Sequence, residues 1–137
     1  MIEKIDHIDE DLGVFIDNEF NRYANKFDVT CNYVDFCYAA KDGDKIMGII
    51  VGHSYYKEVH ITDLIVKEEY RGQDIGTKLV RYVEQQYQDK GFENINLTTY
   101  AFQAPEFYKK LGFEVEYVRK SSDEKLDKYF LIKHLSE

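Results

Sequence analysis

The chain of 137 residues is 44% hydrophobic and 15% aromatic with a single proline, a composition that excludes a disordered or fibrous protein and predicts one domain over residues 1–137. No apolar run reaches the roughly 18 residues of a membrane span, and the acidic start is unlike a secretion signal, so we expect a cytoplasmic protein with no membrane partner. A net charge of −8 argues against a nucleic-acid partner and suits a cationic substrate, although the same charge also keeps an ordinary protein dispersed.

The first half of the chain predicts a helix followed by three antiparallel strands. A short strand is expected at residues 2–5, and residues 12–27 have the apolar spacing of a helix. Strands rich in β-branched and aromatic residues follow at 33–40, 46–55 and 59–66. The Asp-Gly pair of KDGDK and the tetrapeptide YYKE supply the two turns.

The second half predicts a strand, helix, strand unit and a closing pair of strands. Residues 75–88 have the spacing of an amphipathic helix and lead to a strand at residues 94–99. This strand should lie parallel to the one at 59–66, which puts the loop at residues 71–76 at the carboxyl end of the first strand. A short helix at 103–111 and strands at 113–119 and 128–134 complete an α/β fold with a mixed sheet.

The cysteines and histidines predict neither a disulfide nor a metal site. Cys31 and Cys37 lie six residues apart in an extended stretch, about 20 Å, whereas a disulfide spans less than about 7 Å. The four histidines are scattered without the spacing of a zinc site. We therefore expect a protein of a reducing compartment that holds no metal.

The stretch YRGQDIGTKLV, residues 70–80, runs from a glycine loop into a helix. Backbone N–H groups at a helix start are unpaired and partly positive, so such a loop can hold an anion without a basic side chain. It is not a P-loop, because Thr77 rather than a lysine follows Gly76, and no G-x-G-x-x-G is present. Taken alone, the loop is also what any tight strand-to-helix turn would use.

Together with a second motif, this loop resembles the GNAT acyltransferase family. That family binds acetyl-CoA through a Gln/Arg-x-x-Gly-x-Gly/Ala loop, which Arg71 and Gly76 match and Asp74 does not. The run APEFYKKLGF, residues 104–113, matches a second family motif, A-x-x-x-Y-x-x-x-G-F. The resemblance covers residue 32 to the end and implies the GNAT acyl-CoA N-acyltransferase fold, a mostly antiparallel mixed sheet with a central splayed parallel strand pair flanked by helices.

The resemblance also implies a cofactor site and a reaction. Acetyl-CoA would lie between the strands of Val66 and Leu97, where backbone N–H groups polarise the acetyl carbonyl. A primary amine would then attack the thioester directly in a ternary complex. The implied cofactor-binding residues are Leu64, Ile65, Val66, Arg71, Gly72, Gln73, Asp74, Ile75, Gly76, Thr77, Ala104 and Tyr108.

Tyr108 matches the family tyrosine that protonates the departing CoA thiolate, which makes it the predicted general acid. From spacing alone, Phe107, Tyr108 and Leu111 are equally the packed side of a short helix. The resemblance favours the catalytic role.

His60 is the predicted general base, because imidazole titrates in the physiological range and family members with a strand-borne base place Glu or His at this offset. It precedes Val66 by six residues, which in a regular strand places both side chains on one face. His53, Asp63 or water are alternatives, and a lone strand histidine is often only a packed residue.

The motifs do not identify the acceptor substrate or the partners of the protein. Two groups of residues are candidates for an acceptor pocket: the acids of SSDEKLD, residues 121–127, and four tyrosines, Tyr33, Tyr38, Tyr55 and Tyr56. Alternatively, the acids belong to a solvated loop and the tyrosines are ordinary aromatic residues of strands. We expect a small-molecule amine or a protein amine as acceptor, favour a small cationic amine, and leave a homodimer open. The rival function is an acetyl-CoA sensor without turnover, and a purely structural interaction domain would leave both motifs unexplained.

Asp74 is the residue of the glycine loop that does not match the family pattern. A carboxylate there would repel a pyrophosphate, but aspartate is a good helix N-cap and tolerates left-handed backbone. We therefore predict that its side chain caps the helix that begins at Ile75 and turns outward when CoA binds.

Overall fold

The computed structural model describes residues 1–135, which form two compact units, Met1–Asn32 and a second unit that begins at Tyr33. The single N-acetyltransferase domain expected over residues 1–137 therefore stays a prediction. No helix among residues 1–135 is both long and apolar enough to cross a membrane.

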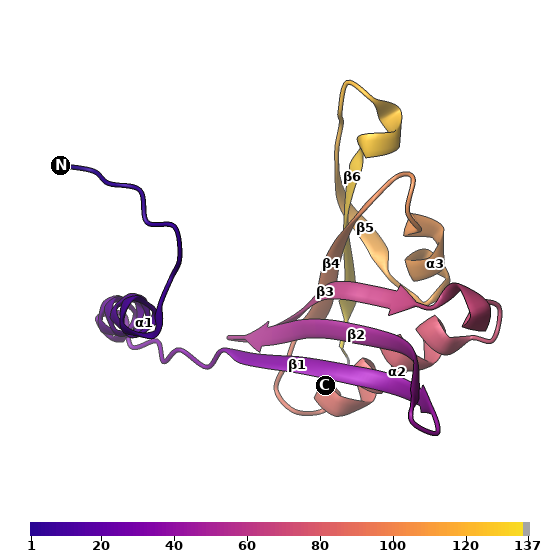
Figure 1. The fold of residues 1–137 in the computed structure, drawn as a ribbon, viewed down its shortest axis with the longest axis horizontal. Coiled ribbons are helices and arrows are strands. Elements are labelled where there is room, and N and C mark those ends of the chain that lie inside the picture. The colour runs from indigo at the N-terminus through magenta and orange to yellow at the C-terminus, as the bar shows by residue number, and fades with distance from the viewer. Residues whose placement is uncertain (136–137) are drawn as a thin grey trace. The chain divides into compact units, whose positions relative to one another are not determined.

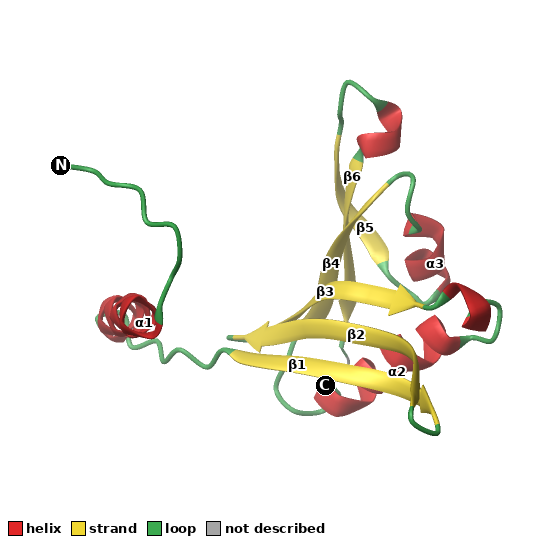
Figure 2. Cartoon of the chain, in the orientation of Figure 1, coloured by secondary structure: helices red, strands yellow, loops and turns green. Residues whose placement is uncertain are grey.

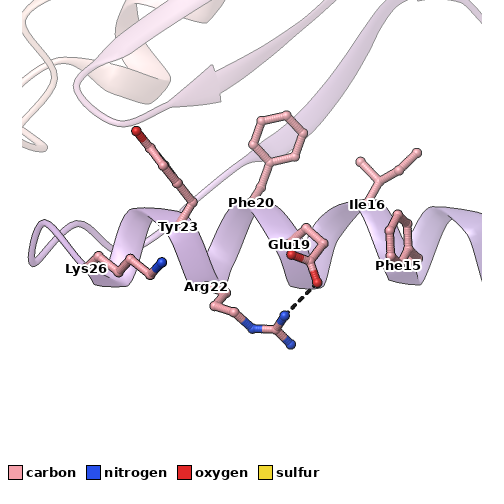
Figure 3. A pocket seen from close by; sticks show the side chains of 7 residues that line it. All are labelled: Phe15, Ile16, Glu19, Phe20, Arg22, Tyr23 and Lys26. Carbon is pink, nitrogen blue, oxygen red and sulfur yellow. Dashed lines mark hydrogen bonds and ion pairs between the residues drawn. The ribbon is translucent and has the colours of Figure 1, made fainter.

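The first unit contains one helix, α1, Glu10–Asn25. It begins two residues earlier than predicted because Asp9 caps it, with its carboxylate accepting a hydrogen bond from the Leu12 amide at 2.8 Å. Figure 3 shows Ile16, Phe20 and Tyr23 projecting from one side of α1, and the helix has no buried residue.

The strand predicted at residues 2–5 is wrong, since this segment has no regular secondary structure. Ile2 and Ile5 are both exposed. A segment of four residues cannot form a strand without a partner strand to complete its backbone hydrogen bonds, and the first unit has no strand among its described residues.

The second unit is built on a six-stranded sheet (Figures 1 and 2). The strands are β1 (Val34–Asp42), β2 (Lys45–Tyr55), β3 (Glu58–Val66), β4 (Asn94–Tyr100), β5 (Glu114–Arg119) and β6 (Lys128–His134). Their order is β1-β2-β3-β4-β6-β5, and every neighbouring pair is antiparallel except β3 and β4. The α/β fold with a mostly antiparallel mixed sheet is confirmed.

Two helices cover one face of this sheet. They are α2, Ile75–Tyr87, and α3, Pro105–Lys110, and short 3-10 turns lie at Glu68–Tyr70 and Glu124–Leu126. The predicted apolar side of α2 packs into the core, where Val80 and Val83 are fully inaccessible beside Ile50 of β2 and Ile95 of β4. We call the opposite side of the sheet the second face.

The parallel pair is splayed. Strands β3 and β4 are paired only at their first residues, Glu58 with Asn94, Val59 with Ile95 and His60 with Asn96, and then diverge (Figure 1). From Ile61 to the end of β3, the edge that faces β4 therefore has no strand partner among the described residues.

A β-bulge interrupts β3 in its middle. Val51 of β2 pairs with Asp63, but the next residue, Gly52, pairs with Ile61, so Thr62 is an extra residue in β3. The Thr62 hydroxyl donates a hydrogen bond to the Val51 carbonyl at 3.1 Å. A Cβ at Gly52 would overlap the His60 carbonyl oxygen, so only glycine permits this approach.

Candidate functional site

The end of β3 supplies open backbone to the site. Leu64 and Val66 point toward the helix-covered face, since they pair with Ile50 and Gly48 of the buried side of β2. The Arg71 Nε donates a hydrogen bond to the Val66 carbonyl at 3.3 Å, which folds the loop back over the strand end. An extended ligand can pair with this edge as an added strand would.

The glycine loop leads from β3 to the start of α2. Gly72 has a φ of 83°, and Asp74, the N-cap residue, has a φ of 61°. The first helical hydrogen bond runs from the Lys78 amide to the Asp74 carbonyl at 3.0 Å. The N–H groups of the preceding turn thus have no acceptor within the helix, as an anion site requires.

The predicted cap by the Asp74 side chain is wrong. Asp74 occupies the N-cap position in left-handed backbone, as expected, but its carboxylate makes no cap hydrogen bond. A side-chain cap needs extended backbone at this residue, as at Asp9 of α1, whereas the left-handed conformation turns the carboxylate away from the first-turn N–H groups. These groups are therefore not occupied by Asp74.

Helix α3 closes the site from the other side. A Cβ at Gly76 would lie 3.2 Å from Cζ of Phe107, so glycine lets α2 and α3 approach closely. The Leu111 carbonyl at the end of α3 accepts a hydrogen bond from Lys133 of β6 at 2.8 Å. Glu84 of α2 pairs with Lys133 at 3.0 Å and thus ties α3, α2 and β6 together.

Tyr108 of α3 is buried, with its ring packed edge-on against Phe107 and Phe113 at centroid distances of 5.0 and 5.7 Å. Burial raises the pKa of its hydroxyl from 10.0 to about 12. Among the described residues, nothing forms a hydrogen bond with this hydroxyl. Every fully buried side-chain polar atom of these residues has a hydrogen-bond partner, so the Tyr108 hydroxyl is not fully buried. The hydroxyl therefore opens onto the adjacent cavity and keeps its proton.

These elements enclose one cavity of about 710 Å³. Of the predicted cofactor residues, eleven line it and only Gln73 does not; those present are Leu64, Ile65, Val66, Arg71, Gly72, Asp74, Ile75, Gly76, Thr77, Ala104 and Tyr108. Tyr70, Phe107, Lys110 and Leu111 also line the cavity and were missed. The periodicity of α3 predicted that Phe107 and Leu111 pack in the core, and no signal in the sequence distinguished a core residue from one that lines the cavity.

His60 does not line this cavity, and the prediction that it shares a face with Val66 is wrong. The extra residue Thr62 reverses the alternation of side chains, so His60 faces the second face with its partner His53. There its Nδ1 lies 2.7 Å from Oδ1 of Asn96, at the last paired position before β3 and β4 diverge. Its role as a base stays a prediction.

The other candidates also lie outside the cavity. Asp63 is exposed on the second face beside Val51. In the SSDEKLD loop, Asp127 is buried and accepts hydrogen bonds from the Ser121 amide at 2.8 Å and from Lys120 at 3.2 Å, which hold its carboxyl pKa below its ordinary value. Asp127 thus shapes the loop. Among the described residues no three His, Cys, Asp or Glu side chains gather as metal ligands.

The chain belongs to the acetyltransferase (GNAT) family, whose model matches residues 5–113. It is similar to the blasticidin-S acetyltransferase of Streptomyces morookaense, with 29% identity over 79 residues, 57% of this chain and 58% of that protein. It is also similar to the thialysine N-epsilon-acetyltransferase of Bos taurus, with 32% identity over 74 residues, 46% of this chain and 44% of that protein. The chain thus spans about half the length of the curated relatives it matches.

A solved structure of an acetyltransferase from Bacillus cereus ATCC 14579 is similar over nearly the whole chain. The TM-score is 0.78 and the identity 28%, covering 97% of this chain and 98% of that chain. This similarity covers more of the chain than the family model, whose match ends at residue 113.

Proposed function

We propose that this protein is an N-acetyltransferase that moves the acetyl group of acetyl-CoA to a primary amine. The observation that carries the proposal is the cavity itself, because one space of about 710 Å³ joins the open edge of β3, the glycine loop of α2 and the hydroxyl of Tyr108. An anion site, a strand-like groove and a proton donor are the three features such a reaction needs.

The cavity fits acetyl-CoA chemically. The unpaired N–H groups at the start of α2 suit the pyrophosphate, and the open edge of β3 suits the amide-bearing pantetheine arm. Its volume falls in the range of about 300–1,000 Å³ typical of cofactor sites. Asp74 is the one residue lining the cavity whose charge opposes a phosphate.

When bound, acetyl-CoA supplies an activated thioester. The amine nitrogen would form a bond to the carbonyl carbon as the carbon–sulfur bond breaks, and the Tyr108 hydroxyl would give its proton to the thiolate. The tyrosinate would then take up the proton that the attacking nitrogen loses on becoming an amide. A phenol with a pKa of about 12 holds that proton through the physiological pH range. The amine must lose its own proton before attack, and His60 on the second face is the proposed acceptor.

For the acceptor we propose a small cationic amine, with a protein amine as the alternative. The relatives named above act, by their names, on blasticidin S and on the ε-nitrogen of thialysine. A net charge of −8 favours a cationic partner. A cytoplasmic location, the absence of nucleic-acid and membrane partners, and a homodimer remain predictions.

The rival function is an acetyl-CoA sensor that binds without turnover. Such a module needs the β3 edge and the glycine loop but has no use for a proton donor. The Tyr108 hydroxyl that opens onto the cavity therefore favours the enzyme.

A panel of primary amines, each incubated with the protein and acetyl-CoA, tests the proposal, with released CoA thiol as the readout. We expect thiol release that depends on both protein and amine. Binding of acetyl-CoA without transfer to any amine would support the sensor, and no binding at all would contradict both functions.

A further inference from the structure

A chain of hydrogen bonds crosses the second face where β3 and β4 stop pairing. Nδ1 of His60 lies 2.7 Å from Oδ1 of Asn96. The Asn96 Nδ2 donates to Oδ1 of Asn94 at 2.8 Å and lies 3.4 Å from Oε1 of Glu58. The Asn94 Nδ2 donates to the same Glu58 oxygen at 3.4 Å.

These contacts fix the orientation of the Asn96 amide. Its NH₂ group must face the two oxygens of Asn94 and Glu58, so its Oδ1 is the atom that meets His60. An amide oxygen only accepts hydrogen bonds, and the proton therefore belongs on Nδ1 of His60. The other ring nitrogen, Nε2, is left with a lone pair.

The charged and titratable groups around His60 come from strands β1, β2 and β3 and from Tyr33, which precedes β1. His53 of β2 lies with its ring centroid 5.4 Å from that of His60, and Tyr33 stacks on His53 at 4.8 Å. The Tyr33 hydroxyl donates to Asp35 of β1 at 2.8 Å, and Glu58 stands at the far end of the amide chain. Burial and the neighbouring His60 lower the pKa of His53, whereas Asp35 raises it.

His60 and His53 thus differ in the groups that surround their rings. His60 has an oriented acceptor on Nδ1, whereas no such contact among the described residues fixes the ring of His53 and burial lowers its pKa. Of the two rings, His60 is the one whose tautomer the surrounding side chains fix.

Resting on the proposed acetyl transfer, we infer that Asn96, oriented by Asn94 and Glu58, is a positioning residue that holds His60 with its proton on Nδ1, so that Nε2 takes a proton from the acceptor ammonium on the second face. The nitrogen–proton bond of the ammonium breaks and the lone pair stays on the amine. His60 becomes an imidazolium whose Nδ1–H still donates to Asn96, and it returns the proton to solvent after the transfer.

The first test reads the tautomer without any substrate. In protein labelled with ¹⁵N-histidine, with His60 assigned by comparison with His60→Gln, we expect the NMR pattern of a protonated Nδ1 and an unprotonated Nε2. Asn96→Leu should abolish this preference, and Thr98→Val, a change at an exposed residue on the same face of β4, should preserve it. A protonated Nε2 in the parent, or an unchanged pattern in Asn96→Leu, would overturn the inference.

The second test is kinetic, with an amine that the protein acetylates. Asn96→Leu should lower kcat about 10-fold and leave the KM for acetyl-CoA unchanged, because only the orientation of the base is lost. Asn96→Asp keeps an oxygen that accepts from Nδ1 but loses the NH₂ contacts with Asn94 and Glu58, so it should recover only part of the rate. It should also move the acidic limb of the pH profile to higher pH, since a carboxylate stabilises an imidazolium. Unchanged rate and pH profile in Asn96→Leu would overturn the inference and leave the acetyl transfer intact.

Failure of the parent to acetylate any amine would instead contradict the proposed function. It is recognised as a separate result because the tautomer of His60 is read by NMR in the same protein, in the absence of turnover.

Discussion

The C-terminal end of β3 contributes backbone to the cavity, whereas its N-terminal end contributes side chains to the second face. Residues 64–66 have an open edge beside the glycine loop, and Glu58 and His60 pair with β4 and take part in its amide chain. One extra residue, Thr62, separates the two ends and reverses the facing of the side chains between them. A single strand can thus present an open backbone edge toward the cavity and the His60 side chain toward the second face.

The largest expected effect lies on the cavity side. Tyr108→Phe should lower kcat about 100-fold, the usual contribution of a positioned acid, with the affinity for acetyl-CoA unchanged. The ring contacts with Phe107 and Phe113 remain, so stability should change little. Single-turnover kinetics and calorimetry measure the two quantities, with Tyr82→Phe on the exposed side of α2 as the control.

The same tyrosine gives a pH dependence. Because its pKa rises from 10.0 to about 12 on folding, the stability it contributes is complete below pH 10.0 and is lost as the pH rises toward 12. The rate should therefore show no alkaline limb from Tyr108 below pH 10.0. An alkaline limb well below that pH that disappears in Tyr108→Phe would show that the hydroxyl is not held in its neutral form.

The next effect tests the boundary between the two ends of β3. Gly52→Ala would press a methyl group on the His60 carbonyl and the Phe36 ring, and should lower the free energy of unfolding by about 1–3 kcal/mol. Urea denaturation measures it, with Gly13→Ala, where nothing lies within 4 Å, as the control. A neutral Gly52→Ala would mean that the bulge is absent and that His60 shares the face of Val66.

The smallest effect concerns the charge at the glycine loop. Asp74→Asn keeps a residue that tolerates left-handed backbone and removes the repulsion of a phosphate, so it should tighten CoA binding about 2- to 5-fold at low salt and less at high salt. Asp89→Asn is the matched control, because Asp89 also has a positive φ but lies outside the cavity. Equal affinities for parent and Asp74→Asn would show that the carboxylate points away from the ligand.

Much of the second unit could be predicted from the sequence because its signals are local. The strands of branched residues, the amphipathic α2 and Pro105 at the start of α3 each depend on a few neighbours in the chain, and eleven of the twelve predicted cofactor residues lie around one cavity. Two motifs in the expected order were sufficient to indicate the family.

The errors have a different origin, because they depend on pairing between distant residues. The bulge at Thr62 exists only in the register of β3 against β2, so a count of six residues from His60 to Val66 could not show it. The chain of Asn94, Asn96 and Glu58 requires β3 beside β4. The prediction that Asp74 caps α2 is wrong because the direction of its carboxylate depends on the left-handed backbone at this residue.

Binding of acetyl-CoA at the C-terminal end of β3 and the start of α2 is tested most directly by a titration of ¹⁵N-labelled protein with CoA, followed by amide NMR. We expect saturation at about one CoA per chain, with the largest shifts at residues 64–66 and 72–77 and small shifts for the amides of Glu58 and Asn96 on the second face. No saturable shifts, or shifts concentrated on the second face with the glycine loop unaffected, would contradict it.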